Sequence, residues 1–255
     1  MSIVQSRGLA AGKADFERRL AAARARHGAQ SVEVADLLTS FGVGLYNIAS
    51  STDDRQLKAE SIHYLEAAIA AYRAAFGDAH PEVALALNSY ADAQIALNRE
   101  NPPPSAETAL EEAYRIRLRA LGPTNFETLA NLRYLAMLRS RASWTRGEPA
   151  RIEAAAALFL ELIARSPAHA QPEYISAPAG RVALALMYAQ NRMPTEAREQ
   201  LRLAVEQAGS WPRYERCMFT AIETDRIESM LAGAPAGTPD MMLIAAERCF
   251  VPDDE

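Results

Sequence analysis

The chain has 255 residues, a net charge of −5 and an isoelectric point near 5.5. This mild acidity argues against nucleic-acid binding, because proteins that bind phosphate backbones gather Lys and Arg on one surface. Twelve glycines and 14 prolines are too few to form the many turns of a many-stranded sheet protein, while runs of alanine favour closely packed helices. We therefore expect an all-α array.

Targeting signals are absent from the first residues as given, and no apolar stretch approaches the roughly 20 residues that span a bilayer. We expect no membrane insertion and, by default, a cytoplasmic location, while an exported mature form stays open. A homo-oligomer is possible, and nothing in the sequence indicates one.

Helical periodicity and helix breakers place the elements in chain order. We expect a capping helix at 12–27, within an N-terminal cap over 1–30, and then four helix pairs over 31–208. Ser105 and Thr195 are predicted to cap the helices that follow them. The predicted pairs are 31–49 with 56–76, 81–98 with 105–121, 125–142 with 149–166, and 178–191 with 195–208.

An internal repeat supports these pairs. Glycines recur about every 45 to 50 residues, and ten residues after each comes a leucine that opens a common pattern. In this pattern a bulky residue follows three positions later, with a small residue directly after it. The three copies are Gly28 with Leu38-x-x-Phe41-Gly42, Gly77 with Leu87-x-x-Tyr90-Ala91, and Gly122 with Leu132-x-x-Leu135-Ala136.

The second helix of each pair carries two small residues seven positions apart, which fall on one helical face. Arg117 stands in the middle of one copy, where an apolar residue is expected, and its long stem can cover apolar surface. The fourth pair matches at every key position. The copies are Ala68-x₃-Tyr72-x₂-Ala75, Ala113-x₃-Arg117-x₂-Ala120, and Leu184-Ala185-x-x-Tyr188 with Ala197-x₃-Leu201-x₂-Ala204.

From about residue 10 to 208 the chain resembles the tetratricopeptide repeat (TPR) family. The joint Phe76-Gly77-Asp78-Ala79-His80-Pro81-Glu82-Val83-Ala84 is similar to the joints of the longer repeats in kinesin light chains. The resemblance implies a right-handed superhelical solenoid of antiparallel helix pairs, in which helix A of each pair lines a concave groove. It carries no implication of motor binding.

After residue 208 the repeat fades. We expect atypical capping helices over 209–250, one at about 213–232 and a last one ending near Cys249, with a frayed tail at 251–255. The whole of 1–255 is predicted to be a single solenoid domain, with the irregular joint from Ser166 to Pro178 as its hinge. Cys217 and Cys249 are expected to be two independent buried thiols, and a disulfide between them is the alternative.

Catalytic, metal and cofactor sites find no support in the sequence. The four histidines are scattered, and no pair of ligands shares a helical turn. His80 is better explained as a turn residue and His63 as a surface residue. No phosphate-binding glycine loop or nucleophile elbow is present, and Gly42 already has a packing role. We expect no enzyme activity and no cofactor.

The remaining function is binding of a protein or peptide segment. The family register places a mixed set of side chains in the groove, and without a Lys and Asn clamp they do not favour capture of a terminal carboxylate. We expect an amphipathic helix or extended segment to bind a scaffold or adaptor; the alternative is a peptide-sensing receptor whose superhelix changes curvature. The groove residues are Thr39, Val43, Tyr46, Asn88, Asp92, Ile95, Arg133, Met137, Ser140, Val182 and Leu186.

Overall fold

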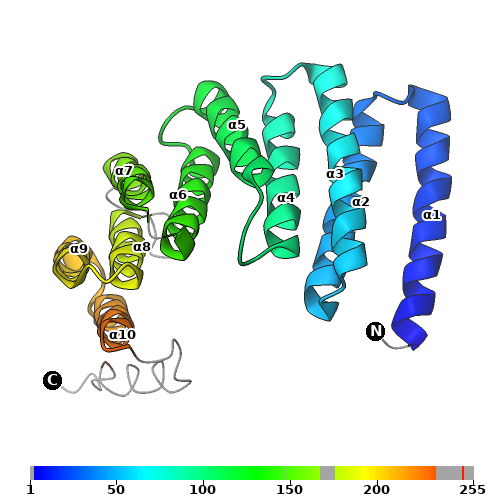
Figure 1. The fold of residues 1–255 in the computed structure, drawn as a ribbon. Coiled ribbons are helices and arrows are strands. Elements are labelled where there is room, and N and C mark those ends of the chain that lie inside the picture. The colour runs from blue at the N-terminus through cyan, green and yellow to red at the C-terminus, as the bar shows by residue number, and fades with distance from the viewer. Residues whose placement is uncertain (1–2, 147, 167–175, 234–248, 250–255) are drawn as a thin grey trace, which may run out of the picture. The chain divides into compact units, whose positions relative to one another are not determined.

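The computed structural model describes residues 3–146, 148–166, 176–233 and Cys249. Among these residues there are ten α-helices, one 3₁₀ turn and no strand, as the sequence predicts (Figure 1). The chain divides into two compact units, unit 1 (Met1–Pro123) and unit 2 (Thr124–Glu255), and each is described by itself. The single solenoid domain expected over 1–255 stays a prediction.

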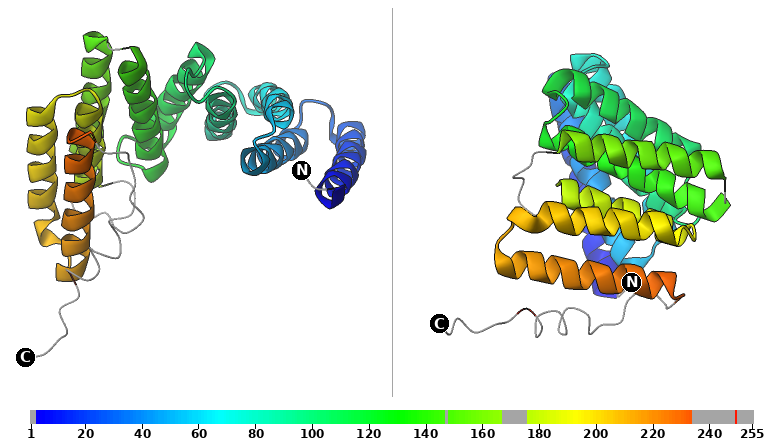
Figure 2. Two further views of the ribbon diagram at one scale, coloured as in Figure 1. Left: turned by 60° about the horizontal axis from the view of Figure 1, so that its bottom comes forward. Right: turned by 90° about the vertical axis from the view of Figure 1, so that its left-hand side faces the viewer.

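Unit 1 holds the predicted capping helix and the first two helix pairs. The capping helix packs on α2, and each later helix packs on the one before it, with a further contact between α2 and α4 (Figures 1 and 2). Its helices are α1 (Ile3–His27), α2 (Val32–Thr52), α3 (Arg55–Phe76), α4 (Pro81–Leu97) and α5 (Pro104–Leu121).

Unit 2 repeats this arrangement and adds the predicted capping helix. The pairs α6 with α7 and α8 with α9 are packed in sequence, α6 also contacts α8, and α10 packs against both α8 and α9. A 3₁₀ turn at Ala208–Ser210 leads into α10. The helices are α6 (Phe126–Arg146), α7 (Pro149–Arg165), α8 (Ala177–Gln190), α9 (Pro194–Gln207) and α10 (Arg213–Leu231).

The small residue of the repeat pattern lets paired helices approach closely. A Cβ on Gly42 of α2 would lie 2.8 Å from Cγ of Leu65 on α3, which is closer than carbon atoms pack. The Ser61 hydroxyl of α3 also donates a hydrogen bond to the Gly42 carbonyl at 2.8 Å. In unit 2, a Cβ on Gly180 of α8 would lie 2.9 Å from Cγ1 of Ile163 on α7, so helices of neighbouring pairs also approach closely, at a position outside the repeat pattern. The predicted packing role of Gly42 is confirmed.

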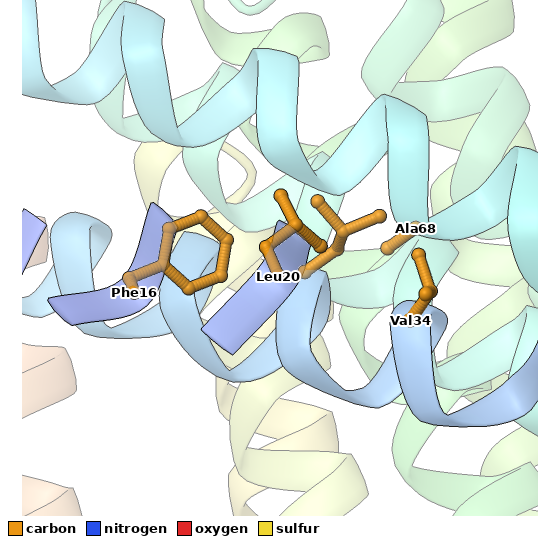
Figure 3. Close-up of a cluster of buried hydrophobic side chains, with 5 residues drawn as sticks. Phe16, Leu20, Val34 and Ala68 are labelled. Atoms are coloured by element: carbon orange, nitrogen blue, oxygen red, sulfur yellow. The ribbon is translucent and has the colours of Figure 1, made fainter. Parts of the chain in front are cut away.

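The capping helix α1 joins unit 1 through a cluster of buried apolar side chains. Phe16 and Leu20 of α1 meet Val34 of α2 and Ala68 of α3, and Leu38 completes the cluster (Figure 3). The ring of Phe16 also stacks on that of Phe41, with 3.7 Å between ring centroids. Burial of these side chains is the main favourable contribution to docking of α1.

The recurring glycines end the helix that precedes each pair. Gly28, Gly77 and Gly122 have φ angles of 90°, 83° and 88°, values that side chains with a Cβ rarely adopt. After Gly77, His80 caps α4, and its Nδ1 accepts a hydrogen bond from the Glu82 amide at 3.3 Å. The prediction of His80 as a turn residue is confirmed, and His63 is exposed as expected.

Two predicted helix caps are wrong. Neither Ser105 nor Thr195 is an N-cap, because α5 is capped by Pro103 and α9 by Met193, each followed by a proline in the first turn. Proline suits this position, since its missing N–H has no partner there and its φ is already helical. The serine and threonine therefore lie inside the first turn.

The prediction of two independent thiols is also wrong. Cys217 of α10 and Cys249 form a disulfide across a sequence separation of 32 residues. Sequence spacing could not distinguish the two outcomes, because pairing depends on how the chain returns to α10. The predicted helix before Cys249, the frayed tail and most of the predicted hinge lie outside the described residues.

Candidate peptide-binding surface

The eleven predicted groove residues lie on the first helix of each pair, as the register requires. Six of them, from Thr39 to Ile95, belong to α2 and α4 of unit 1. The other five, from Arg133 to Leu186, belong to α6 and α8 of unit 2.

In unit 1 several of these side chains also stabilise the fold. Val43 and Tyr46 are half-buried against a cluster formed by Ile62, Leu65 and Ala93, and Ile95 is buried. The two α2 side chains therefore fill the space between helices as well as facing outward.

The polar members of the unit 1 set are also half-buried. The Thr39 hydroxyl donates to the Ala35 carbonyl at 2.9 Å, within its own helix. Asn88 and Asp92 are half-buried, one turn apart on α4. Their contact with a partner stays a prediction.

In unit 2 the structure brings all five predicted residues to one cavity of about 360 Å³. Arg133, Met137 and Ser140 come from α6, and Val182 and Leu186 come from α8. The remaining lining comes from Phe159 of α7, from Ala179, Ala183, Met187 and Gln190 of α8, and from Phe219, Glu223 and Arg226 of α10.

The lining of this α6/α8/α10 cavity combines apolar and charged groups. Phe159 and Met187 are fully buried, while Met137 leaves 44% of its surface exposed. The Ser140 hydroxyl is turned back to the Met137 carbonyl at 2.8 Å. The cavity can thus take an apolar side chain and offers charged groups for its polar neighbours.

Glu223 is a charged residue of the cavity whose pKa is shifted. Burial raises the pKa of its carboxyl above the ordinary value, although Arg226 partly opposes the rise through its own charge. The Arg226 guanidinium lies 3.5 Å from a Glu223 oxygen, a long contact, and half of the Arg226 side chain is exposed. A ligand that reaches this pair can therefore engage both charges.

The α10 residues of the cavity were missed by the sequence interpretation. Phe219, Glu223 and Arg226 are spaced by four and three positions, so they share one face of a helix. That spacing was visible, but the repeat register ends before α10 and gave no reason to direct this face toward α6 and α8. Packing of Ile227 against α8 and α9 orients the helix, as does the Arg198 guanidinium, which donates to both Glu228 oxygens at 2.8 Å.

Neither a metal centre nor a membrane-spanning helix is found in the part of the chain that the structure describes. Among these residues, no group of three or more His, Cys, Asp or Glu could hold a metal ion. Within the same ranges, every helix is too short or too polar to cross a bilayer.

Comparison with solved structures decides the fold. Two crystal structures of a putative kinesin light chain from Podosopora anserina, described as nearly identical TPR-like repeats, align with a TM-score of 0.57; one of them is a variant with a single substitution. The alignment covers 82% of this chain and 92% of the other, at 19% sequence identity. The fold is a TPR-like helical repeat.

The TPR-like fold predicted from the sequence is therefore confirmed. No protein-family model matches the chain, and no curated protein matches it in sequence. At 19% identity the likeness shows the fold alone, and function has to be argued from the surface of this chain.

Proposed function

We propose that this protein is a non-catalytic scaffold that binds a peptide segment of a partner protein in the α6/α8/α10 cavity. The main support is a single observation. The five groove residues predicted in this half of the chain, from register alone, line one cavity with both an apolar floor and charged groups.

The size of the cavity indicates the kind of ligand. About 360 Å³ lies at the small end of the range of roughly 300 to 1,000 Å³ for ligand pockets. It suits one or two apolar side chains of a helix or extended segment better than a large cofactor. Met137 and Leu186 would contact the inserted side chain, as anchors do in peptide grooves.

The charged residues of the cavity would determine which residues of the bound segment can lie beside its inserted apolar side chain, the anchor. Arg133 and Arg226 favour a carboxylate on the bound segment, and Glu223 favours a cation close to it. A segment with both charges beside an apolar anchor therefore fits better than an acidic or a basic one. Thr39, Asn88 and Asp92 of unit 1 remain proposed partner contacts of that unit, considered apart from this cavity.

A pair of matched variants tests the proposal. Met137 of α6 and Leu160 of α7 have similar exposed fractions, 44% and 48%, but only Met137 lines the cavity. Affinity capture from extracts of the source cells should recover the same partner with the wild type and with Leu160→Glu. Met137→Glu should lose it, because a carboxylate would replace the apolar contact and would be desolvated by the bound anchor.

Equal recovery by Met137→Glu and Leu160→Glu would show that the cavity is not the binding site. Circular dichroism and thermal unfolding of both variants provide the control, since loss of binding counts only if the helices remain folded.

The disulfide is relevant to the cellular compartment of the protein. Disulfides persist in oxidising compartments and are rare in the cytosol, so the Cys217–Cys249 pair favours an exported protein. The cytoplasmic location expected by default stays a prediction. Mass spectrometry of alkylated, unreduced protein from the source cells decides between them: free thiols on both cysteines would support the cytosol.

A further inference from the structure

Unit 1 contains a second, larger cavity that the groove register does not include. It has a volume of about 720 Å³ and lies between α1 and α2. Its apolar lining consists of Leu9 and Phe16 of α1 and of Leu37, Phe41, Leu45 and Ile48 of α2. We call it the α1–α2 cleft.

Three glycines in the walls of this cleft have no role in packing. A Cβ on Gly8, Gly12 or Gly44 would meet no atom within 4 Å. Gly42, two residues before Gly44, differs because its Cβ would clash with Leu65. Glycine inside a helix is destabilising, and nothing in the described chain requires it at the first three positions. The space beside these glycines admits close approach by another backbone.

The cleft runs lengthwise along both helices. On α1 it is lined at positions 8, 12, 15 and 19, and on α2 at positions 37, 41, 44 and 48. Steps of four, three and four residues follow one face of a helix. A helix lying parallel to both walls would contact each stripe along its whole length.

The repeat itself shows which helix belongs in such a place. Within unit 1, α2 packs along α3 and also contacts α4, which is the first helix of the next pair. A helix with the same relation to α1 and α2 would lie along α1, contact α2 and fill the cleft. Among the described helices of unit 1, none occupies that position.

Charge narrows the chemistry of the occupant. Four charged residues line the cleft, namely Lys13, Asp15 and Arg19 of α1 and Asp36 of α2, and Lys13 is paired with Glu60 of α3. Arg19 is exposed at the cleft, and the Asp15 carboxylate already accepts a hydrogen bond from Arg18 at 2.8 Å. The Asp36 carboxylate accepts a hydrogen bond from the Tyr72 hydroxyl of α3. A helix that fits therefore has an apolar stripe and an acidic residue opposite Arg19.

We propose that the α1–α2 cleft is a docking site for an acidic amphipathic helix of a partner protein, which packs on α1 and α2 as α2 packs on α3 and α4. This site is independent of the α6/α8/α10 cavity. It predicts a partner segment with a bulky residue, a second bulky residue three positions later and a small residue next to it, so that the small residue meets Gly12 or Gly44.

A peptide with the sequence of residues 81–97 is a suitable probe. It is the α4 sequence, contains the pattern Leu87-x-x-Tyr90-Ala91, and has two acidic residues and no Lys or Arg. Fluorescence anisotropy of the labelled, end-capped peptide should show saturable binding to the full chain. A scrambled peptide of the same composition should not bind.

The deciding variant is Gly12→Ala with Gly44→Ala. Because both Cβ atoms enter open space, this variant should melt roughly 5 °C higher than the wild type. The same methyl groups occupy the place of the docked helix and should weaken peptide binding about tenfold or more. Arg19→Gln should weaken the peptide's binding at low salt without changing the melting temperature.

The proposal is overturned if the double glycine variant binds the peptide as the wild type does, or if the scrambled peptide binds equally well. It is also overturned if Met137→Glu abolishes peptide binding, because the peptide would then occupy unit 2. Displacement of the peptide from the wild type by hexadecanoate at low micromolar concentration would instead make the cleft a lipid site. Full binding by Met137→Glu, together with loss in the glycine variant, supports it.

Discussion

At the scale of single residues, two glycines of one helix have opposite relations to their surroundings. Gly42 lies where α2 and α3 are in contact, so its missing side chain is required by packing. Gly44 faces the α1–α2 cleft and has open space around it. The repeat pattern predicts the first of these roles, because the small position recurs in each pair. The pattern does not predict the role of Gly44, because that residue lies outside its recurring positions.

This contrast predicts opposite effects for the same substitution. Gly42→Ala should lower the free energy of unfolding of unit 1 by about 1–3 kcal/mol, because Leu65 would have to move. Gly44→Ala should raise it by about 0.5–1 kcal/mol through helix propensity. Urea unfolding of the two variants measures both, and a loss of stability in Gly44→Ala would show that the cleft is occupied within the chain.

The raised pKa of Glu223 predicts that Glu223→Gln increases the free energy of unfolding, and that this increase depends on pH. Burial disfavours the charged carboxylate, so the folded wild type loses stability relative to the variant as pH rises through the raised pKa. Well below the ordinary value of 4.5 both carry an uncharged side chain, and their difference should disappear. Urea unfolding from about pH 3.5 to about pH 7.5, on either side of that transition, follows the change. A variant less stable than the wild type at neutral pH would contradict the direction of the shift.

At the scale of helices, the order and pairing could be predicted within a few residues, because proline and glycine mark most ends. The start of α1 could not. It begins at Ile3 rather than near residue 12, since Gly8 and Gly12 resemble helix breakers in a sequence but lie within the helix. Individual caps also depend on local geometry, and the N-cap positions of α5 and α9 are held by Pro103 and Met193 rather than by Ser105 and Thr195.

Capping gives a prediction with an internal control. Asp54 caps α3, and one carboxylate oxygen accepts hydrogen bonds from the Gln56 and Leu57 amides at 2.9 and 3.1 Å. Asp54→Ala should lower the free energy of unfolding by about 1 kcal/mol. Ser105→Ala should leave it nearly unchanged, because that exposed residue is not the cap of α5. Thermal unfolding measures both variants. An equal loss of stability in Ser105→Ala would support Ser105 as the cap of α5, as the sequence predicted.

At the scale of the whole molecule, the described residues of each unit form two helix pairs and one helix that departs from the repeat. The pairs were predictable because each repeats the same contacts. The contributions of α1 and α10 were not, because these two helices do not carry the repeat pattern that sets the register of the pairs. The α10 side chains of the proposed binding cavity, Phe219, Glu223 and Arg226, and the α1–α2 cleft therefore appear only in three dimensions.

The disulfide is a further long-range feature, and its loss should affect one unit. Replacing both cysteines, Cys217→Ser with Cys249→Ser, should lower the stability of unit 2 by roughly 3–4 kcal/mol, because the unfolded chain is no longer cross-linked. Unit 1 should not change. Hydrogen exchange measured by mass spectrometry separates the units, and faster exchange in α2 and α3 of the variant would contradict this. Adding a reductant to the variant is the control.

The claim that unit 2 binds its partner through the α6/α8/α10 cavity is tested most directly by photo-crosslinking. A photoreactive amino acid is placed at Met137, inside the cavity, and separately at Leu160, which is similarly exposed on α7. Position 137 should crosslink to a partner segment with an apolar anchor, and position 160 should not. Equal crosslinking from both positions, or crosslinking from position 160 alone, would contradict the claim.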